Sequence, residues 1–97
     1  MIECKCFLFV DAYDDEELNR KPIVSDLVFD LNEVRAITNY VNDDREITKD
    51  SMIYTDTDTF IVDIPYGVMK ILLANRHYTH LQDGIINWQQ AVDIIKN

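Results

Sequence analysis

Polar and apolar residues alternate at the start of the chain and then give way to a continuous apolar run. Residues 2–10 are Ile-Glu-Cys-Lys-Cys-Phe-Leu-Phe-Val. Alternation with a period of two is typical of a strand with one buried face, and an unbroken apolar run is typical of a central strand. We therefore expect a first strand over residues 2–10. Residues 11–22 are polar and acidic and end in Lys21-Pro22, which predicts a long connection.

Three further segments predict strands. Residues 23–31 are mostly apolar and predict a short strand that enters a tight turn at 30–33. Residues 34–41 alternate again and predict another strand, with a helix over 31–41 as the weaker alternative. After an acidic loop at 42–50, β-branched and aromatic residues on both sides of a polar turn predict a hairpin over 52–64.

The first of two helices is expected from about Pro65 to Asn75, because Asp63 and Pro65 are favoured at a helix start. This helix is apolar nearly all round, with one stripe for the core and a second stripe formed by Met69 and Leu73. Such a helix is either buried on two sides or faces a partner. Of these two possibilities, internal burial is favoured.

The second helix has a readable start at Asn87, an N-cap residue followed three positions later by Gln90, and it ends near Lys96. A chain of 97 residues, 47% of them hydrophobic, is enough for one core and one domain. The order of the elements predicts a single acidic α+β domain over residues 1–97. We expect an antiparallel sheet of four or five strands followed by two C-terminal helices.

The chain is strongly acidic, which argues against several classes of partner. Its 18 acidic and 9 basic residues give a net charge of −9. Direct binding of DNA or RNA needs a basic surface, and an anionic membrane repels an acidic one. No apolar run approaches the roughly 18 residues of a membrane-spanning helix, and the N-terminal residues lack the basic segment of a signal peptide. We therefore expect a cytoplasmic protein that contacts neither nucleic acid nor membrane directly.

The acidic residues are concentrated in the first two thirds of the chain. Residues 1–63 carry a net charge of −10, and residues 64–97 carry a net charge of +1. The acids come in bursts between apolar segments, which predicts that they lie in loops or at strand ends. Three clusters are candidate partner-binding residues: Asp14, Asp15, Glu16 and Glu17; Asp43, Asp44 and Glu46; and Asp56 with Asp58.

Metal and catalytic sites receive little support from the sequence. Cys4, Cys6, His77 and His80 match a Cys₂His₂ ligand count, but cysteines one residue apart on a strand suit buried packing better than zinc. The segment 56–59 begins like a calcium loop, but the glycine and glutamate that the loop requires do not follow. The chain has two glycines and no nucleophile motif, so we expect no enzyme, no metal and no cofactor.

The charge predicts a small non-enzymatic protein-interaction module whose acidic clusters contact a basic surface of a partner protein. One such surface is a groove that normally holds nucleic acid, and an acidic mimic of nucleic acid would block it, as anti-CRISPR inhibitors do. Enrichment in Ile, Asp and Asn fits a phage or mobile element with an AT-rich genome. Acidic loops that only maintain solubility would give the same charge.

Two alternatives remain open. An oligomeric adaptor or regulator, including a homo-oligomer, would assemble through the apolar helix at 65–75, with Met69 and Leu73 at the interface. A metal or small-ligand site would instead use the two cysteines and the two histidines.

The layout of the central segments resembles that of small flagellar regulators of the FlbD type. The resemblance covers residues 26–73 and consists of the order strand, Leu-Asn-Glu-Val-Arg-Ala-Ile, hairpin and Pro-Tyr-Gly-Val-Met-Lys-Ile-Leu. It concerns layout alone, so no function is inferred from it.

Overall fold

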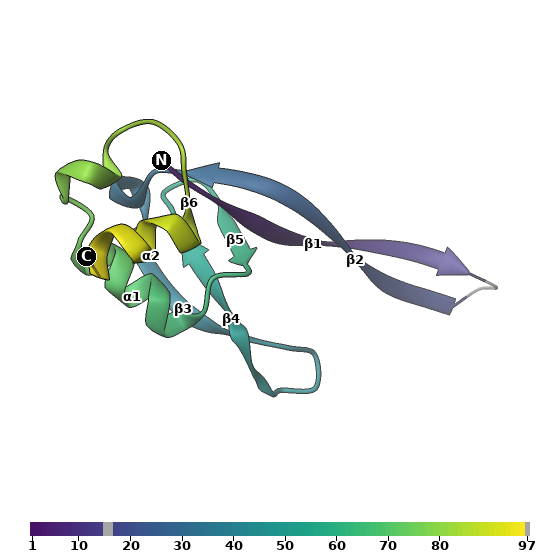
Figure 1. The fold of residues 1–97 in the computed structure, drawn as a ribbon. Helices are drawn as coiled ribbons and strands as arrows, with labels where there is room; N and C mark the ends of the chain where they lie inside the picture. Colours follow the sequence, from purple (N-terminus) through teal and green to yellow (C-terminus); the bar gives the residue numbers. More distant parts are fainter. Residues whose placement is uncertain (15–16, 97) are drawn as a thin grey trace.

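The computed structural model describes residues 1–14 and 17–96, with the backbone alone for residues 10–14 and 17–21. Its elements, in chain order, are β1 (Ile2–Asp14), β2 (Glu17–Phe29), β3 (Ala36–Val41), β4 (Ile47–Tyr54), β5 (Thr59–Val62), α1 (Tyr66–Ala74), β6 (Ile86–Asn87) and α2 (Trp88–Lys96). Short 3-10 helices lie at Leu31–Glu33 and Thr79–Leu81. The predicted α+β fold, an antiparallel sheet followed by two C-terminal helices, is confirmed (Figure 1).

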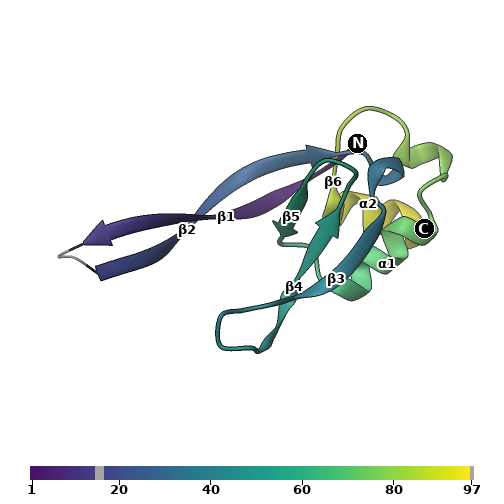
Figure 2. The ribbon, with the colours of Figure 1, turned by 180° about the vertical axis from the view of Figure 1, so that it is seen from behind.

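The sheet has the strand order β2-β1-β5-β4-β3, with β6 added beside β1 in parallel. Both helices lie on one face of it, in front of the sheet in Figure 1 and behind it in Figure 2. The molecule measures 52 × 25 × 24 Å, because the β1–β2 hairpin extends far beyond the helices. We call residues 8–23 of this hairpin the arm, and the remaining sheet with its helices the body.

The core lies between the sheet and the helices of the body. Alternate residues of β1 point into it, so Ile2, Cys4 and Cys6 are buried while Glu3 and Lys5 are exposed. The other elements contribute Phe29, Leu31, Val34, Ile53, Val62, Ile64, Met69, Leu72, Leu81 and Ala91. The alternation that predicts the first strand is therefore the alternation between core and solvent.

The helices are too short to cover the whole sheet. Each has nine residues and is about 14 Å long. In contrast, the thirteen residues of β1 span about 43 Å. The helix-covered face of β1 therefore continues past Cys6 into the arm, where its next side chain, Leu8, is exposed.

The prediction of a long connection at residues 11–22 is wrong. Backbone pairing between β1 and β2 runs without interruption from Ile2–Phe29 to Asp14–Glu17. Pairing between two strands satisfies the backbone groups that face the partner strand whatever the side chains are, and the outward-facing groups can bond to water, so a polar sequence can form strands here. Nor does the apolar run mark a fully central strand, since β5 pairs with β1 only at Cys6 and Phe7.

Pro22 lies within β2 without interrupting it. The backbone carbonyl of Lys5 faces β5, because it accepts a hydrogen bond from the N–H of Asp63 at 3.0 Å. Along a strand, the backbone N–H and C=O groups of successive residues point alternately to one side and to the other. Lys5 and Phe9 are four residues apart, so the backbone groups of both point away from β2, and neither Lys5–Asp26 nor Phe9–Pro22 is a hydrogen-bonded pair. The position of the missing N–H of Pro22 therefore faces the outer edge of the sheet. A proline there keeps the β1–β2 ladder intact and hinders another strand from pairing with β2.

Local signals locate both helices correctly. Helix α1 follows Pro65, and Asn87 caps α2 by accepting a hydrogen bond from the N–H of Gln89 at 2.9 Å. The hydroxyl of Ser51, which is fully buried, donates to the carbonyl of Ile64 at 2.6 Å and ties β4 to the start of α1. The alternative helix over 31–41 is wrong, because that segment forms a 3-10 turn and β3. Among residues 1–14 and 17–96, no helix has the length and apolar character needed to cross a membrane.

Candidate protein-interaction surface

The acidic clusters lie at the ends of three different hairpins. The described members are Asp14 and Glu17 at the end of the arm, Asp43, Asp44 and Glu46 between β3 and β4, and Asp56 and Asp58 between β4 and β5. Asp15 and Glu16 lie outside the described residues. The last two clusters are at opposite ends of β4, whose eight residues span about 26 Å. The arm points in a third direction, so the fold does not merge the clusters into one surface (Figure 1).

Asn42 holds the β3–β4 turn in one conformation. Its side-chain oxygen accepts hydrogen bonds from the backbone N–H groups of Asp44, at 3.0 Å, and Glu46, at 2.9 Å. The N–H of Arg45 donates to the carbonyl of Asn42 at 3.0 Å, and Arg45 adopts a left-handed φ of 62°. The turn therefore presents the exposed side chains of Asp43, Asp44 and Glu46 on a backbone that is fixed by local hydrogen bonds.

Two exposed aliphatic side chains flank this acidic turn. Val41 and Ile47 are cross-strand partners, with exposed fractions of 47% and 72%. Asn39 pairs with Ser51, whose side chain points to the helix-covered face. Val41 lies two residues after Asn39, so Val41 and its partner Ile47 point to the same face, beyond the reach of the helices.

A bulge and a ring contact fix the position of this hairpin. Pairing shifts register between Asn39 and Val41, and the hydroxyl of Thr48 fills the irregularity: it donates to the carbonyl of Tyr40 at 2.9 Å and accepts from the N–H of Asp50 at 3.1 Å. The ring of Tyr40 stacks on Phe9 of β1, with 6.2 Å between centroids. Since β4 and β5 separate β3 from β1 in the strand order, this contact requires a strongly coiled sheet.

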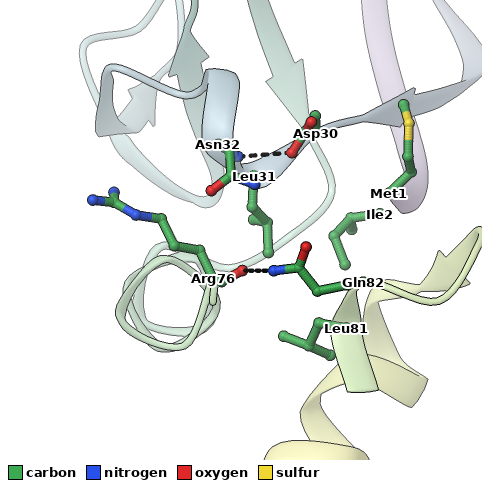
Figure 3. A pocket seen from close by; sticks show the side chains of 8 residues that line it. All are labelled: Met1, Ile2, Asp30, Leu31, Asn32, Arg76, Leu81 and Gln82. Atoms are coloured by element: carbon green, nitrogen blue, oxygen red, sulfur yellow. Dashed lines mark hydrogen bonds between the residues drawn. The ribbon is translucent and has the colours of Figure 1, made fainter. Parts of the chain in front are cut away.

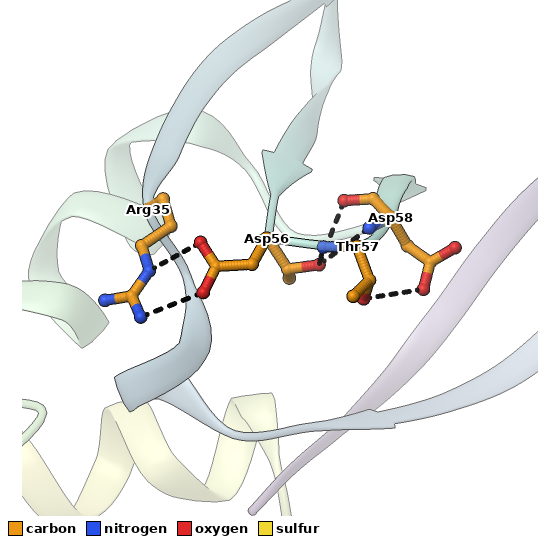
Figure 4. A network of polar contacts seen from close by, with 5 residues as sticks. Arg35, Asp56, Thr57 and Asp58 are labelled. Carbon is orange, nitrogen blue, oxygen red and sulfur yellow. Dashed lines mark hydrogen bonds and ion pairs between the residues drawn. The ribbon is translucent and has the colours of Figure 1, made fainter.

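The β4–β5 turn is acidic in sequence but partly neutralised in the structure. Both carboxylate oxygens of Asp56 accept hydrogen bonds from the guanidinium of Arg35, each at 3.1 Å (Figure 4). This hydrogen-bonded ion pair lowers the pKa of Asp56 and raises that of Arg35. The carboxylate of Asp58 accepts a hydrogen bond from the hydroxyl of Thr57 at 3.0 Å. Of the two predicted contact residues here, Asp56 is thus already engaged by a residue of its own chain.

Met69 is not available as a contact for a partner. Its side chain has no solvent exposure and belongs to the core, because the stripe that carries it packs against the sheet. Leu73 is half-buried against the same core. The outer surface of α1 instead exposes Ile71 and Lys70, and the ammonium of Lys70 lies 5.3 Å from the ring centre of Tyr66. The apolar interface predicted at Met69 and Leu73 is therefore corrected to internal packing.

The cysteines and histidines do not gather into a site. Cys4 and Cys6 are buried free thiols, and burial raises the pKa of Cys4 to about 12 and also raises that of Cys6. His77 and His80 are exposed, where the ring of His80 contacts Tyr78 and His77 accepts a hydrogen bond from Arg76 at 3.4 Å. Across the described part of the chain, no three His, Cys, Asp or Glu side chains are grouped as metal ligands.

A small depression lies where the N-terminal strand meets the segment before α2 (Figure 3). Its volume of about 130 Å³ is below the roughly 300 Å³ of a typical small-molecule site. Two of its polar groups are engaged internally, since Asp30 accepts from the N–H of Asn32 at 2.9 Å and Gln82 donates to the carbonyl of Arg76 at 3.1 Å. We therefore interpret the depression as a packing boundary between the elements that carry Ile2, Leu31 and Leu81.

Asp50 is an unusual carboxyl on β4. Its Oδ1 atom is buried and has no hydrogen-bond partner. Burial is the main cause of its raised pKa, which the nearby Asp63 raises further and Lys49 opposes. Since this group lies on the body rather than at a hairpin end, we interpret it as a local cost in stability.

Sequence reasoning identified the acidic turns but not the exposed aliphatic pairs beside them. Val41–Ile47 on one hairpin and Leu8–Ile23 on the other are cross-strand partners with exposed side chains. In the sequence they look like ordinary strand residues. The available signal for Val41 and Ile47 is their position directly on either side of a polar turn, where a strand commonly leaves the core.

Comparison of the chain with protein-family models, with curated proteins and with solved structures finds no match.

Proposed function

We propose that this protein is a non-enzymatic interaction module that binds a basic surface of a partner protein in the cytoplasm. The observation that carries the proposal is the β3–β4 turn, where three exposed acidic side chains stand on a backbone fixed by Asn42. Because the turn is already ordered, little conformational freedom is lost when its carboxylates meet cationic groups. The net charge of −9 adds long-range attraction and faster encounter with such a partner.

Mimicry of nucleic acid is a narrower form of the same proposal. A DNA strand carries one negative charge per about 3.4 Å. The described members of the three predicted clusters lie at separate hairpin ends, with about 26 Å of β4 between two of the clusters. The broader proposal, a basic protein surface, therefore has the stronger support, and the identity of the partner tests the narrower one.

The test is affinity capture from host cells with elution in rising salt. The tagged protein is compared with two variants of equal charge change. One neutralises the β3–β4 turn by Asp43→Asn, Asp44→Asn and Glu46→Gln, and the control neutralises exposed acids of the body by Glu3→Gln, Glu33→Gln and Asp83→Asn.

We expect a partner that elutes at moderate salt, is retained by the control variant and is lost by the turn variant. A partner that normally binds nucleic acid in a basic groove would support mimicry. Equal loss in both variants would mean that only net charge matters, and a partner indifferent to salt would contradict the proposal.

A further inference from the structure

We propose that residues 41–47, the β3–β4 tip, are an insertion element that enters an apolar pocket rimmed by Lys or Arg on the partner. This inference rests on the proposed function and adds the chemistry of the surface that is recognised. Ile47 is the most exposed of the large hydrophobic residues in the described part of the chain, at 72%, and its partner Val41 is 47% exposed. Side by side on one face, they form a small aliphatic surface directly next to three acidic residues.

The β3–β4 tip is ordered before it binds. Asn42 pins the turn through the N–H groups of Asp44 and Glu46, and Thr48 closes the bulge behind Ile47. The ring contact between Tyr40 and Phe9 supports the same hairpin from its opposite face. Binding energy is concentrated in a few anchors that fill pockets, and a rigid element loses little entropy when it supplies them.

Charge decides which occupant fits. Residues 1–63 of a second copy carry a net charge of −10 and would bring further acids against Asp43, Asp44 and Glu46, while residues 64–97, with a net charge of +1, offer little attraction. The surface that complements the tip is instead apolar where it receives Val41 and Ile47, and cationic around them. We therefore commit to a basic partner protein, with self-association as an alternative outcome of the test.

The other exposed aliphatic pair supplies a matched control. Leu8 and Ile23 are also cross-strand partners, and they lie on the same face of the sheet by alternation from Cys6. They are six residues, about 20 Å, from Asp14 and Glu17 at the end of the arm. Leu8 and Ile23 therefore test whether an exposed aliphatic pair away from a hairpin turn binds in the same way as Val41 and Ile47.

The experiment uses defined peptides as probes of this chemistry. The full chain, with labelled Ile, Leu and Val methyl groups, is titrated with a decapeptide of alternating Lys and Leu and with a decapeptide of Lys alone, and NMR shifts and affinities are recorded. The tip variant is Val41→Thr with Ile47→Thr, and the control is Leu8→Thr with Ile23→Thr. Threonine is β-branched and favoured in strands, and all four positions are exposed, so both variants should stay folded.

We expect saturable shifts of the Val41 and Ile47 methyl signals with the Lys-Leu peptide. Its affinity should fall at least tenfold in the tip variant and stay within twofold in the control variant. Equal affinity for both peptides, with unmoved methyl signals, would overturn the insertion element and leave the proposed function intact. An equal loss of affinity for the Lys-Leu peptide in the two variants would also overturn it, as would concentration-dependent self-association through the tip. Failure of both peptides to bind at low salt would overturn the proposed function as well.

Discussion

The body and the arm are built from the same two strands, β1 and β2, but only in the body does a second layer cover them. In the body, Cys4 and Cys6 of β1 are buried under α1 and α2. In the arm, Leu8 lies on the same face of β1 and is 48% exposed, and its partner Ile23 on β2 is 49% exposed. At these four positions the side chains are all apolar. Burial here is thus decided by the length of the helices rather than by the strand pattern.

The two regions also differ in what holds their backbones. In the body, β1 lies between β2 and the short strands β5 and β6. In the arm, the strand pairs of β1 are made with β2 alone. A two-stranded hairpin is marginally stable in water unless it packs against something else. We therefore expect the core of the body to resist perturbation and the arm to contribute little to the global stability.

The largest contrast should appear in thiol reactivity. With a pKa of about 12, Cys4 has roughly 1000-fold less thiolate at pH 8 than a thiol of pKa 9, and burial also blocks access. A thiol reagent at pH 8 should therefore find no rapidly reacting thiol in the native protein. The variant Ile23→Cys should add one rapidly reacting thiol on the arm. Fast labelling of Cys4 or Cys6 in the native chain would show that the body opens far more easily than its packing indicates.

The next effect is truncation of the core. Met69→Ala should lower the free energy of unfolding by about 2–5 kcal/mol, because Met69 is fully buried and its removal leaves a cavity. Ile71→Ala, on the exposed side of the same helix, should cost less than about 1 kcal/mol. Urea denaturation of both variants measures the difference. If Met69→Ala left the free energy of unfolding unchanged but altered the oligomeric state, Met69 would contribute to an interface between copies rather than to the core.

The difference between body and arm also explains how far the sequence could be interpreted. The helix start at Asn87 was predictable because its side chain caps the helix locally, and the start at Pro65 was predictable from the fixed backbone geometry of proline, since α1 has no side-chain capping hydrogen bond. The strand nature of residues 11–14 was missed, because it depends on pairing with a segment whose side chains give no apolar signal. Likewise, the ion pair between Arg35 and Asp56 joins residues 21 positions apart, so no local sequence pattern predicts it.

A smaller effect is expected at Asp50, on the body. Burial raises its folded pKa above the ordinary value of 3.8, so its protonated form is favoured in the fold. The stability that this shift contributes is present below the unfolded pKa and is lost as the pH rises through the folded pKa. Asp50→Asn should therefore raise the free energy of unfolding at pH 7 by about 1 kcal/mol, with a smaller gain at pH 3.

Denaturation curves at both pH values check this, with the exposed Asp83→Asn as the control for the change in net charge. A gain from Asp50→Asn that is the same at pH 3 and pH 7, or one that Asp83→Asn reproduces, would contradict a local origin in the buried oxygen.

The smallest effect is expected for Ile23→Thr in the arm. The side chain is half exposed and no helix covers it, so its replacement by another β-branched residue should change the free energy of unfolding by less than about 0.5 kcal/mol. Val62→Thr, the same kind of change in the body, places a hydroxyl in the core and should cost about 1–3 kcal/mol. Hydrogen exchange of the backbone amides adds an independent readout, because the arm should open without global unfolding. If Ile23→Thr instead destabilised the whole chain as much as Val62→Thr, the arm would have to share the cooperative core of the body. The exposed face of β1 and β2 would then be covered in solution by a contact that the isolated fold does not contain.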